Sequence, residues 1–313
     1  MKAYIVKSIG TADQLQLVDI EKPVAANNEV VIKTKAISIN PVDAKTRDGR
    51  GVYNWIKDEN PLILGWDISG EVTESKSPLF KVGDEVFGMV NFPGHGKVYA
   101  EYVVAKADEL TLKPSNINHE EAAAATLAPL TVWQVMVDNA GIKAGQRVLI
   151  HGASGGVGHY ATQIARHLGA YVIGVSSEKN KDFVLANGAH EHVEYNDLSK
   201  LNELTNIDFV LDAVGEKDIT ELSKPVVRGG KIISIVRGNI SEEEQAHAKS
   251  KDIEAKFVLV KSSGNDMGTI AGLLQKKIIK SHIFQVFDFE QMADAHRQIE
   301  TGRTVGKVVV KVQ

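Results

Sequence analysis

The chain has 313 residues, of which 43 % are hydrophobic and 24 % charged, with a formal net charge of −4. The composition is that of a globular protein, and the length predicts two domains. Mixed charges leave no basic stripe for nucleic acid, and no apolar run reaches the roughly 18 residues of a membrane span. The absence of cysteine excludes disulfides and thiolate metal sites, and the histidines form no HExxH pattern, so we expect no bound metal.

Short strands dominate residues 1–110. The β-branched segments bounded by Pro, Gly and Asn are 3–6, 15–19, 29–39, 70–73, 100–104 and 110–112. Residues 82–86 add a tight turn that leads into a strand. So many strands before any strong helix predict a β-rich, barrel-like domain. Because the chain begins with a strand and no signal peptide precedes it, we expect a cytoplasmic protein.

The pattern changes near residue 119. Helices are predicted over 119–125 and 130–139, and strands then alternate with helices. The expected strands are 147–151, 171–175, 208–213, 231–236 and 256–260, and the helices between them are 157–168, 179–187 and 219–227. Such alternation predicts an α/β domain with a doubly wound parallel sheet covered on both faces.

The tail returns to the first domain in this interpretation. A helix over 290–300 is followed by a strand over 307–312 that suits the β-rich domain better than the parallel sheet. We therefore expect residues 1–120 and 275–313 to form the β-rich domain, and residues 121–274 to form the doubly wound one.

A glycine-rich turn joins the strand 147–151 to the next helix. Gly152, Gly155 and Gly158 recur every three residues. In this pattern the first glycine permits a tight turn, the second lets backbone approach a pyrophosphate, and the third lets the helix pack on the strand. The motif predicts dinucleotide binding, because it stands between a predicted strand and helix.

The end of the second parallel strand gives a mixed signal about the dinucleotide. Glu178 lies about 20 residues after the last glycine, where an acidic residue commonly binds the ribose 2′-hydroxyl of NAD. Ser177, Lys179 and Lys181 suit instead the 2′-phosphate of NADP, which needs charged donors. We favour NADP(H), with NAD as the alternative.

At this point the sequence resembles the zinc-free quinone oxidoreductase branch, which includes zeta-crystallin, of the medium-chain dehydrogenase/reductase superfamily. The motifs that carry the resemblance are residues 39–43 (INPVD), 65–70 (GWDISG), 82–86 (VGDEV), 128–131 (APLT), 152–158 (GASGGVG), 212–215 (DAVG) and 306–309 (GKVV). They cover essentially the whole chain and stand in the family's order. The resemblance implies a Rossmann domain plus a GroES-like barrel domain.

The resemblance also implies chemistry without a metal. Zinc-dependent relatives have Gly-His-Glu where this chain has Gly65, Trp66 and Asp67, and they use cysteines that are absent here. Quinones and enones fit such a site, because conjugation delocalises the negative charge that develops on hydride addition.

Functional residues carry over as expectations. Asn40 and Asp43 resemble the loop at the nicotinamide end of the site, Tyr53 a tyrosine near the substrate, and Thr131 a threonine that serves both catalysis and the nicotinamide. The expected cofactor contacts are Thr131, Gly152, Ser154, Gly155, Gly156, Val157, Gly158, Ser177, Lys179, Lys181, Val214, Ile235, Arg237, Val258, Val260 and Lys307. The alternative for Asn40 and Asp43 is a turn with a helix cap, and for Tyr53 it is packing.

The function implied is NADPH-dependent hydride transfer to a quinone or a similar conjugated carbonyl compound. The alternatives are an alkenal or enone double-bond reductase and, from another class, a non-catalytic NADPH-binding protein with a structural or redox-responsive role. A homodimer is expected by analogy with the family.

Overall fold

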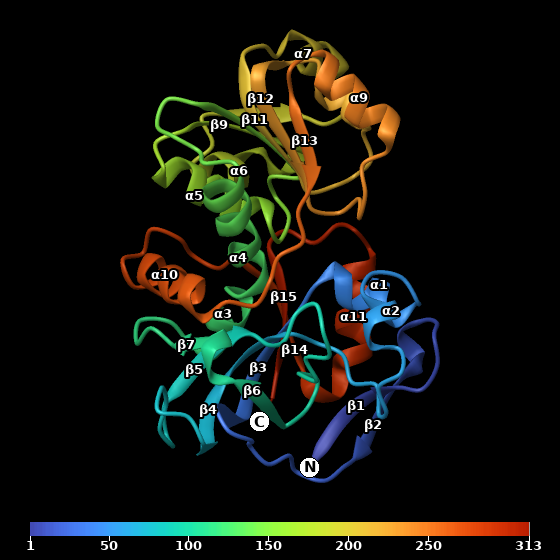
Figure 1. Cartoon of the computed structure of the whole chain (residues 1–313), viewed down its shortest axis with the longest axis vertical. Helices are drawn as coiled ribbons and strands as arrows, with labels where there is room; N and C mark the ends of the chain where they lie inside the picture. The colour runs from blue at the N-terminus through green and yellow to red at the C-terminus, as the bar shows by residue number, and fades with distance from the viewer. Residues whose placement is uncertain (313) are drawn as a thin grey trace. The chain divides into compact units, whose positions relative to one another are not determined.

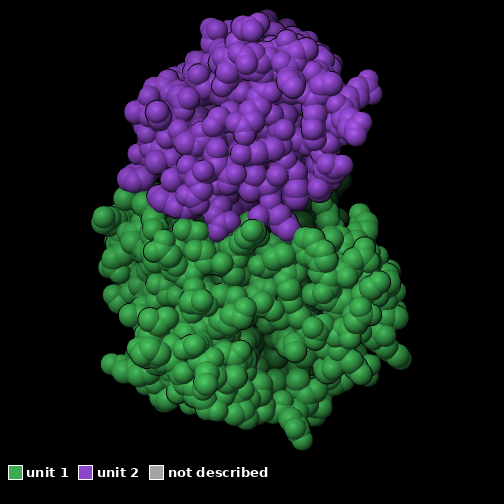
Figure 2. All heavy atoms as spheres, in the orientation of Figure 1, with its two compact units in different colours: residues 1–130, 260–313 green, residues 131–259 purple. Residues whose placement is uncertain are grey.

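The computed structural model describes residues 1–312 and divides the chain into two compact units (Figure 2). The first unit contains residues 1–130 and 260–313, and the second contains residues 131–259. The sequence had placed the boundaries near 120 and 275. The difference arises because the segments 121–130 and 260–274 contribute helices that pack on strands of the first unit.

The first unit is built on a seven-stranded sheet with a separate two-stranded ladder (Figure 1). Its strands are β1 (Lys2–Val6), β2 (Leu15–Asp19), β3 (Glu29–Ile39), β4 (Asp67–Ser75), β5 (Glu85–Met89), β6 (Tyr102–Lys106), β7 (Leu110–Leu112), β14 (Ile283–Asp288) and β15 (Lys307–Lys311). The long strand β3 is central, since it pairs antiparallel with β4, β6 and β15. The expected return of the last strand to this unit is therefore confirmed.

Helices cover this sheet. They are α1 (Pro41–Arg47), α2 (Tyr53–Ile56), α3 (His119–Ala124), α4 (Leu127–Trp133), α10 (Gly264–Gln275) and α11 (Met292–Glu300), with 3₁₀ turns η1 (Ala12–Gln14), η2 (Ala107–Glu109) and η5 (Phe289–Gln291). The helix α3 begins with a capping box, in which Asn118 accepts from the Glu121 backbone and the Glu121 side chain accepts in return. It packs against β3, β4 and β15, and α10 packs against β7.

The second unit has a six-stranded parallel sheet in the order β10-β9-β8-β11-β12-β13. The strands are β8 (Arg147–His151), β9 (Tyr171–Ser176), β10 (Glu191–Glu194), β11 (Ile207–Asp212), β12 (Val226–Ser234) and β13 (Glu254–Phe257). Numbered within the unit, this order is 3-2-1-4-5-6, and the direction of winding reverses between β8 and β11. The doubly wound prediction is confirmed, and the reversal predicts where a ligand binds.

The helices of this unit lie between the strands. They are η3 (Gln134–Asn139), α5 (Gly158–His167), η4 (Glu178–Asn180), α6 (Lys181–Ala186), α7 (Leu198–Glu203), α8 (Ile219–Leu222) and α9 (Glu242–Ser250). Here α5 and α6 pack on β8, β9 and β10, whereas α8 and α9 pack on β12 and β13. The segment η3 is π-helical and completes the predicted helix 130–139 together with α4.

Several predicted elements are wrong at their ends. The strand expected over 231–236 is β12 at 226–234. The helix expected over 219–227 stops at Leu222, because Pro225 cannot continue it and the β-branched Val226 starts β12. The strand expected over 256–260 is β13 at 254–257, because its ladder with β12 ends at the pair of Ser234 with Phe257. Within the described residues no helix is both long and apolar enough to cross a membrane.

Candidate functional site

The glycine-rich turn follows β8 directly. Gly152 has a φ of +88°, which favours glycine, and its N–H and that of Ala153 both donate to the Val175 carbonyl on β9, at 3.0 and 2.9 Å. The helix α5 then begins at Gly158 without an acidic residue in its first turn. A helix start of this kind suits an anion, because the positive end of the helix dipole lies there.

Glycine stands at positions 155 and 158 of the turn for different physical reasons. A Cβ atom on Gly158 would lie 2.0 Å from the Gly152 carbonyl oxygen, so the start of α5 packs too closely on the turn for any side chain. A Cβ atom on Gly155 would meet only that same oxygen, at an ordinary 3.4 Å. The chain's own packing therefore requires glycine at 158 but not at 155, and the space at Gly155 fits an approaching ligand.

A second turn lies beside the first, at the end of β11. A Cβ atom on Gly152 would lie 2.8 Å from a methyl group of Val214. Asp212 fixes this turn, since its Oδ1 accepts from the backbone N–H groups of Val214 and Gly215, at 3.2 and 2.8 Å. The two turns occupy the point where the winding of the sheet reverses, which is the ligand-binding position of this fold.

Asp212 is held as a buried carboxylate. Burial alone would raise its pKa, but hydrogen bonds from His151, Ser234 and the turn lower that pKa to about 2. Arg237 also donates to Asp212, at 3.2 Å, and to Glu244, at 3.3 Å. The structure therefore commits Arg237, expected as a cofactor contact, to holding Asp212.

Polar groups gather at the end of β9. Ser154 in the glycine turn accepts from the Asn180 amide at 3.0 Å, which ties the two loops together. The hydroxyl of Ser177 is buried without a hydrogen-bond partner among the described residues. Glu178 is exposed and lies 3.4 Å from the Lys181 ammonium and 3.8 Å from His192 Nδ1. Sequence reasoning missed Asn180 and His192, because neither belongs to the glycine motif.

The remaining expected cofactor residues lie at several places. Lys179 is exposed on η4, Ile235 donates its N–H to the Asp212 carbonyl at 3.1 Å, and Val258 donates to the Ser234 carbonyl at 3.1 Å. Thr131 and Val260 are buried. Gly156 and Val157 lie within the turn and are half-buried.

In the first unit a polar cluster is completely buried. Asn40, at the start of α1, donates from Nδ2 to Asp67 Oδ2 at 2.8 Å and accepts on Oδ1 from Lys307 Nζ at 2.5 Å. The Lys307 ammonium also lies 3.5 Å from Asp67 Oδ2. Burial lowers the pKa of Lys307 and raises that of Asp67, and each partner opposes the effect on the other.

Asp43 belongs to the same cluster. Its Oδ2 accepts from the Asn40 N–H at 2.7 Å, as the helix-cap interpretation requires, while Oδ1 has no hydrogen-bond partner among the described residues. Burial and the Asp67 carboxylate raise the pKa of Asp43 to about 7, against the opposing effects of the Asn40 backbone, Tyr99 and Lys307. A carboxyl of this kind exchanges its proton near neutral pH.

The cluster changes the expected role of Lys307. Its side chain is 2 % exposed and bound to Asn40 and Asp67, so the structure directs its ammonium to these partners. Tyr53 begins the short helix α2 and is half-buried, outside the cluster's hydrogen bonds. Sequence reasoning missed Tyr99 as a partner of Asp43, because no local pattern links residues so far apart.

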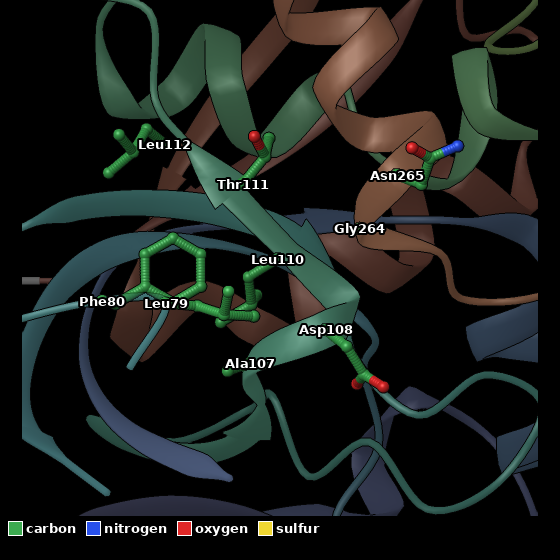
Figure 3. A pocket seen from close by; sticks show the side chains of 9 residues that line it. All are labelled: Leu79, Phe80, Ala107, Asp108, Leu110, Thr111, Leu112, Gly264 and Asn265. Carbon is green, nitrogen blue, oxygen red and sulfur yellow. The ribbon is translucent and has the colours of Figure 1, made fainter. Parts of the chain in front are cut away.

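A surface hollow of about 440 Å³ lies elsewhere in the first unit, beside β7 and the start of α10 (Figure 3). It is lined by Leu79, Phe80, Ala107, Asp108, Leu110, Thr111, Leu112, Gly264 and Asn265. None of the sequence-predicted site residues is among them. Across residues 1–312, no group of three or more His, Asp or Glu side chains could hold a metal ion.

The strand order with a glycine-rich turn after the first strand defines a Rossmann dinucleotide-binding unit. Residues 26–115 match the family model described as an alcohol dehydrogenase GroES-like domain, and residues 187–310 match that of a zinc-binding dehydrogenase.

Proteins that are similar over most of this chain point to the same family. The chain is 31 % identical to quinone oxidoreductase from Sus scrofa, over 99 % of this chain and 97 % of that protein. It is 31 % identical to the mitochondrial NAD(P)H oxidoreductase of Homo sapiens, over 91 % and 82 % of the two chains. The solved structure of quinone oxidoreductase from Coxiella burnetii is 34 % identical, with a TM-score of 0.93 over 100 % of this chain and 99 % of that one.

The chain therefore belongs to the zinc-free quinone oxidoreductase branch of the medium-chain dehydrogenase/reductase superfamily. It is an oxidoreductase of this type that uses a nicotinamide cofactor.

The glycine analysis yields a paired prediction. Gly155→Val should fold like the wild type, because its Cβ has room, yet bind the nicotinamide dinucleotide at least about ten-fold more weakly, a loss of roughly 1.4 kcal/mol. Gly158→Ala should instead lose about 1–3 kcal/mol of unfolding free energy through overpacking. Thermal unfolding and fluorescence titration separate the effects. An unchanged affinity in Gly155→Val would refute the placement of the pyrophosphate.

Proposed function

We propose that this protein uses NADPH to reduce a quinone or a similar conjugated carbonyl compound. The observation that carries the proposal is the pair of turns at residues 152–158 and 212–215, which meet where the winding of the parallel sheet reverses. The open space at Gly155 and the helix start at Gly158 fit a pyrophosphate. When bound, the nicotinamide supplies a hydride.

Three features support NADPH over NADH. The buried hydroxyl of Ser177 has no hydrogen-bond partner in the described part of the chain, and such a group is costly unless a ligand completes it. Lys179 on η4 and Lys181 at the start of α6 are both exposed, and their ammonium groups suit a 2′-phosphate. Glu178 already has a cationic partner in Lys181, at 3.4 Å, so it is less suited to hold a free ribose hydroxyl.

In this proposal the chain positions the acceptor and provides for the proton. Asn40 and Asp43 supply the polar groups of the first unit, and Lys307 orients Asn40 rather than contacting the dinucleotide. Thr131, Val258 and Val260 remain proposed contacts of the nicotinamide, with the two valines acting through their backbone. Tyr53 remains a proposed substrate neighbour.

The function is tested by following NADPH oxidation with a panel of quinones, enones, aldehydes and alcohols, before and after exhaustive chelation. We expect turnover with quinones that survives chelation, because the chain has no cysteine and conjugated acceptors need little carbonyl polarisation. Turnover only with enones would favour the double-bond reductase. Stoichiometric zinc whose removal abolishes activity would contradict the metal-free chemistry, and no oxidation with any acceptor would contradict the proposal.

The cofactor is tested by titrating NADPH and NADH against the wild type and single variants. Each charged hydrogen bond to the 2′-phosphate is worth about 1.5–3 kcal/mol, so Lys181→Ala or Lys179→Ala should weaken NADPH binding roughly ten-fold to a hundred-fold. NADH binding should barely change. Lys200→Ala, an exposed lysine on α7, is the matched control. A wild-type preference for NADH, weakened by Glu178→Ala, would overturn the assignment.

A further inference from the structure

A chain of buried side chains connects α11 to Asp43. Arg47 donates from Nη1 to His296 Nδ1 at 2.9 Å, and His296 Nε2 lies 2.9 Å from the Tyr99 hydroxyl. The Tyr99 hydroxyl in turn interacts with the Asp43 carboxylate. All four side chains are at most 1 % exposed. Glu300, which pairs with Arg47, is the member that reaches solvent, at 39 % exposed.

The chemistry of these groups fixes the direction of donation along this series of side chains. A guanidinium has only donors, so His296 Nδ1 must accept from Arg47. Burial, reinforced by the Arg47 charge, lowers the pKa of His296 to about 3, so the ring is neutral at pH 7. Its one proton therefore sits on Nε2 and is donated to the Tyr99 oxygen. The Tyr99 hydroxyl keeps its own proton for Asp43.

This series of side chains orients hydrogen-bonding groups and does not conduct protons. Arg47 does not release its proton at accessible pH, so no proton can pass from Glu300 through Arg47 to His296. Tyr99 is equally fixed as a neutral phenol, because burial and the Asp43 carboxylate hold its pKa well above the usual value. The series therefore affects Asp43 only by orienting the Tyr99 hydroxyl that faces it.

Asp43 is the acidic group that this arrangement can affect. Arg47 is balanced by Glu300, and Lys307 by Asp67. Asp43 has no cation of its own, so its ionisation adds one net negative charge to the buried group. The groups that face Asp43 are Tyr99, Asp67 on β4 and Lys307 on β15, besides Asn40 on its own helix.

We propose that Arg47, His296 and Tyr99 are positioning residues whose aligned donors set how readily Asp43 exchanges its proton during the reduction. The inference rests on the proposed function for its catalytic consequence. The Oδ1 atom of Asp43, which has no hydrogen-bond partner within residues 1–312, is where a proton can be held and released. The Tyr99 hydroxyl faces Asp43 as a potential donor and lowers the pKa of Asp43, so it favours the charged form of that carboxyl.

The test is a pH titration of the carboxyl carbons of ¹³C-labelled protein by NMR, in which the signal absent from Asp43→Asn identifies Asp43. Tyr99→Phe should raise the pKa of Asp43 by about one unit, a ten-fold change in its protonation equilibrium. His296→Leu should shift it in the same direction. His296→Gln should stay near the wild type, since an amide accepts from Arg47 and donates to Tyr99.

A second readout is the pH profile of kcat for quinone reduction. In Tyr99→Phe and His296→Leu this profile should shift to higher pH, together with the NMR titration. Should Asp43→Asn fail to fold, the profile of Tyr99→Phe decides. The control Arg297→Gln removes an exposed charge beside His296 and should move neither readout. An unmoved Asp43 in Tyr99→Phe, equal behaviour of the Leu and Gln variants, or an Asp43 shift without a shifted profile would overturn the proposal. Absent turnover in the wild type would instead count against the proposed function, with the NMR titration still readable.

Discussion

A buried ammonium is the constraint on which the candidate site depends. Lys307 lies at the start of β15, with Asn40 and Asp67 as its partners. Removing an ammonium from water is costly unless charges and hydrogen bonds compensate it. The compensation requires β15 to pair with β3, which brings the C-terminal strand to the loop that carries Asn40. The site is therefore assembled by the sheet rather than by any local segment.

Contacts within the protein distinguish the glycines and charged residues that have a structural role from those that remain available to a ligand. Gly158 and Arg237 are committed to the protein itself, one by close packing and the other by Asp212 and Glu244. Gly155 and Ser177 are not explained by the chain's own contacts. The proposed assignment of an NADPH-dependent reductase rests on those two unexplained features and on the turns that surround them.

Sequence reasoning could predict what local patterns determine. The strand and helix alternation and the 152–158 turn follow from periodicity and spacing, and the structure confirms the doubly wound sheet. Pro225, which prevents α8 from continuing, is a local signal that the sequence itself contains. Partners distant in sequence were not readable. Tyr99, His296 and Lys307 lie far from Asn40 and Asp43 in the sequence. They join this group only through strand pairing and helix packing, so their shifted pKa values could not be foreseen.

The central claim is that the Lys307 ammonium makes burial of the carboxyl cluster possible, and a double-mutant cycle tests it most directly. Unfolding free energies at pH 7 would be measured for the wild type, Lys307→Met, Asp67→Asn and the double variant. We expect Lys307→Met to cost about 3–5 kcal/mol, because it leaves Asp67 uncompensated. Asp67→Asn should cost less, because Asp43 remains as a counter-ion, and the double variant should cost clearly less than the sum. Losses that add within about 0.5 kcal/mol would contradict the account.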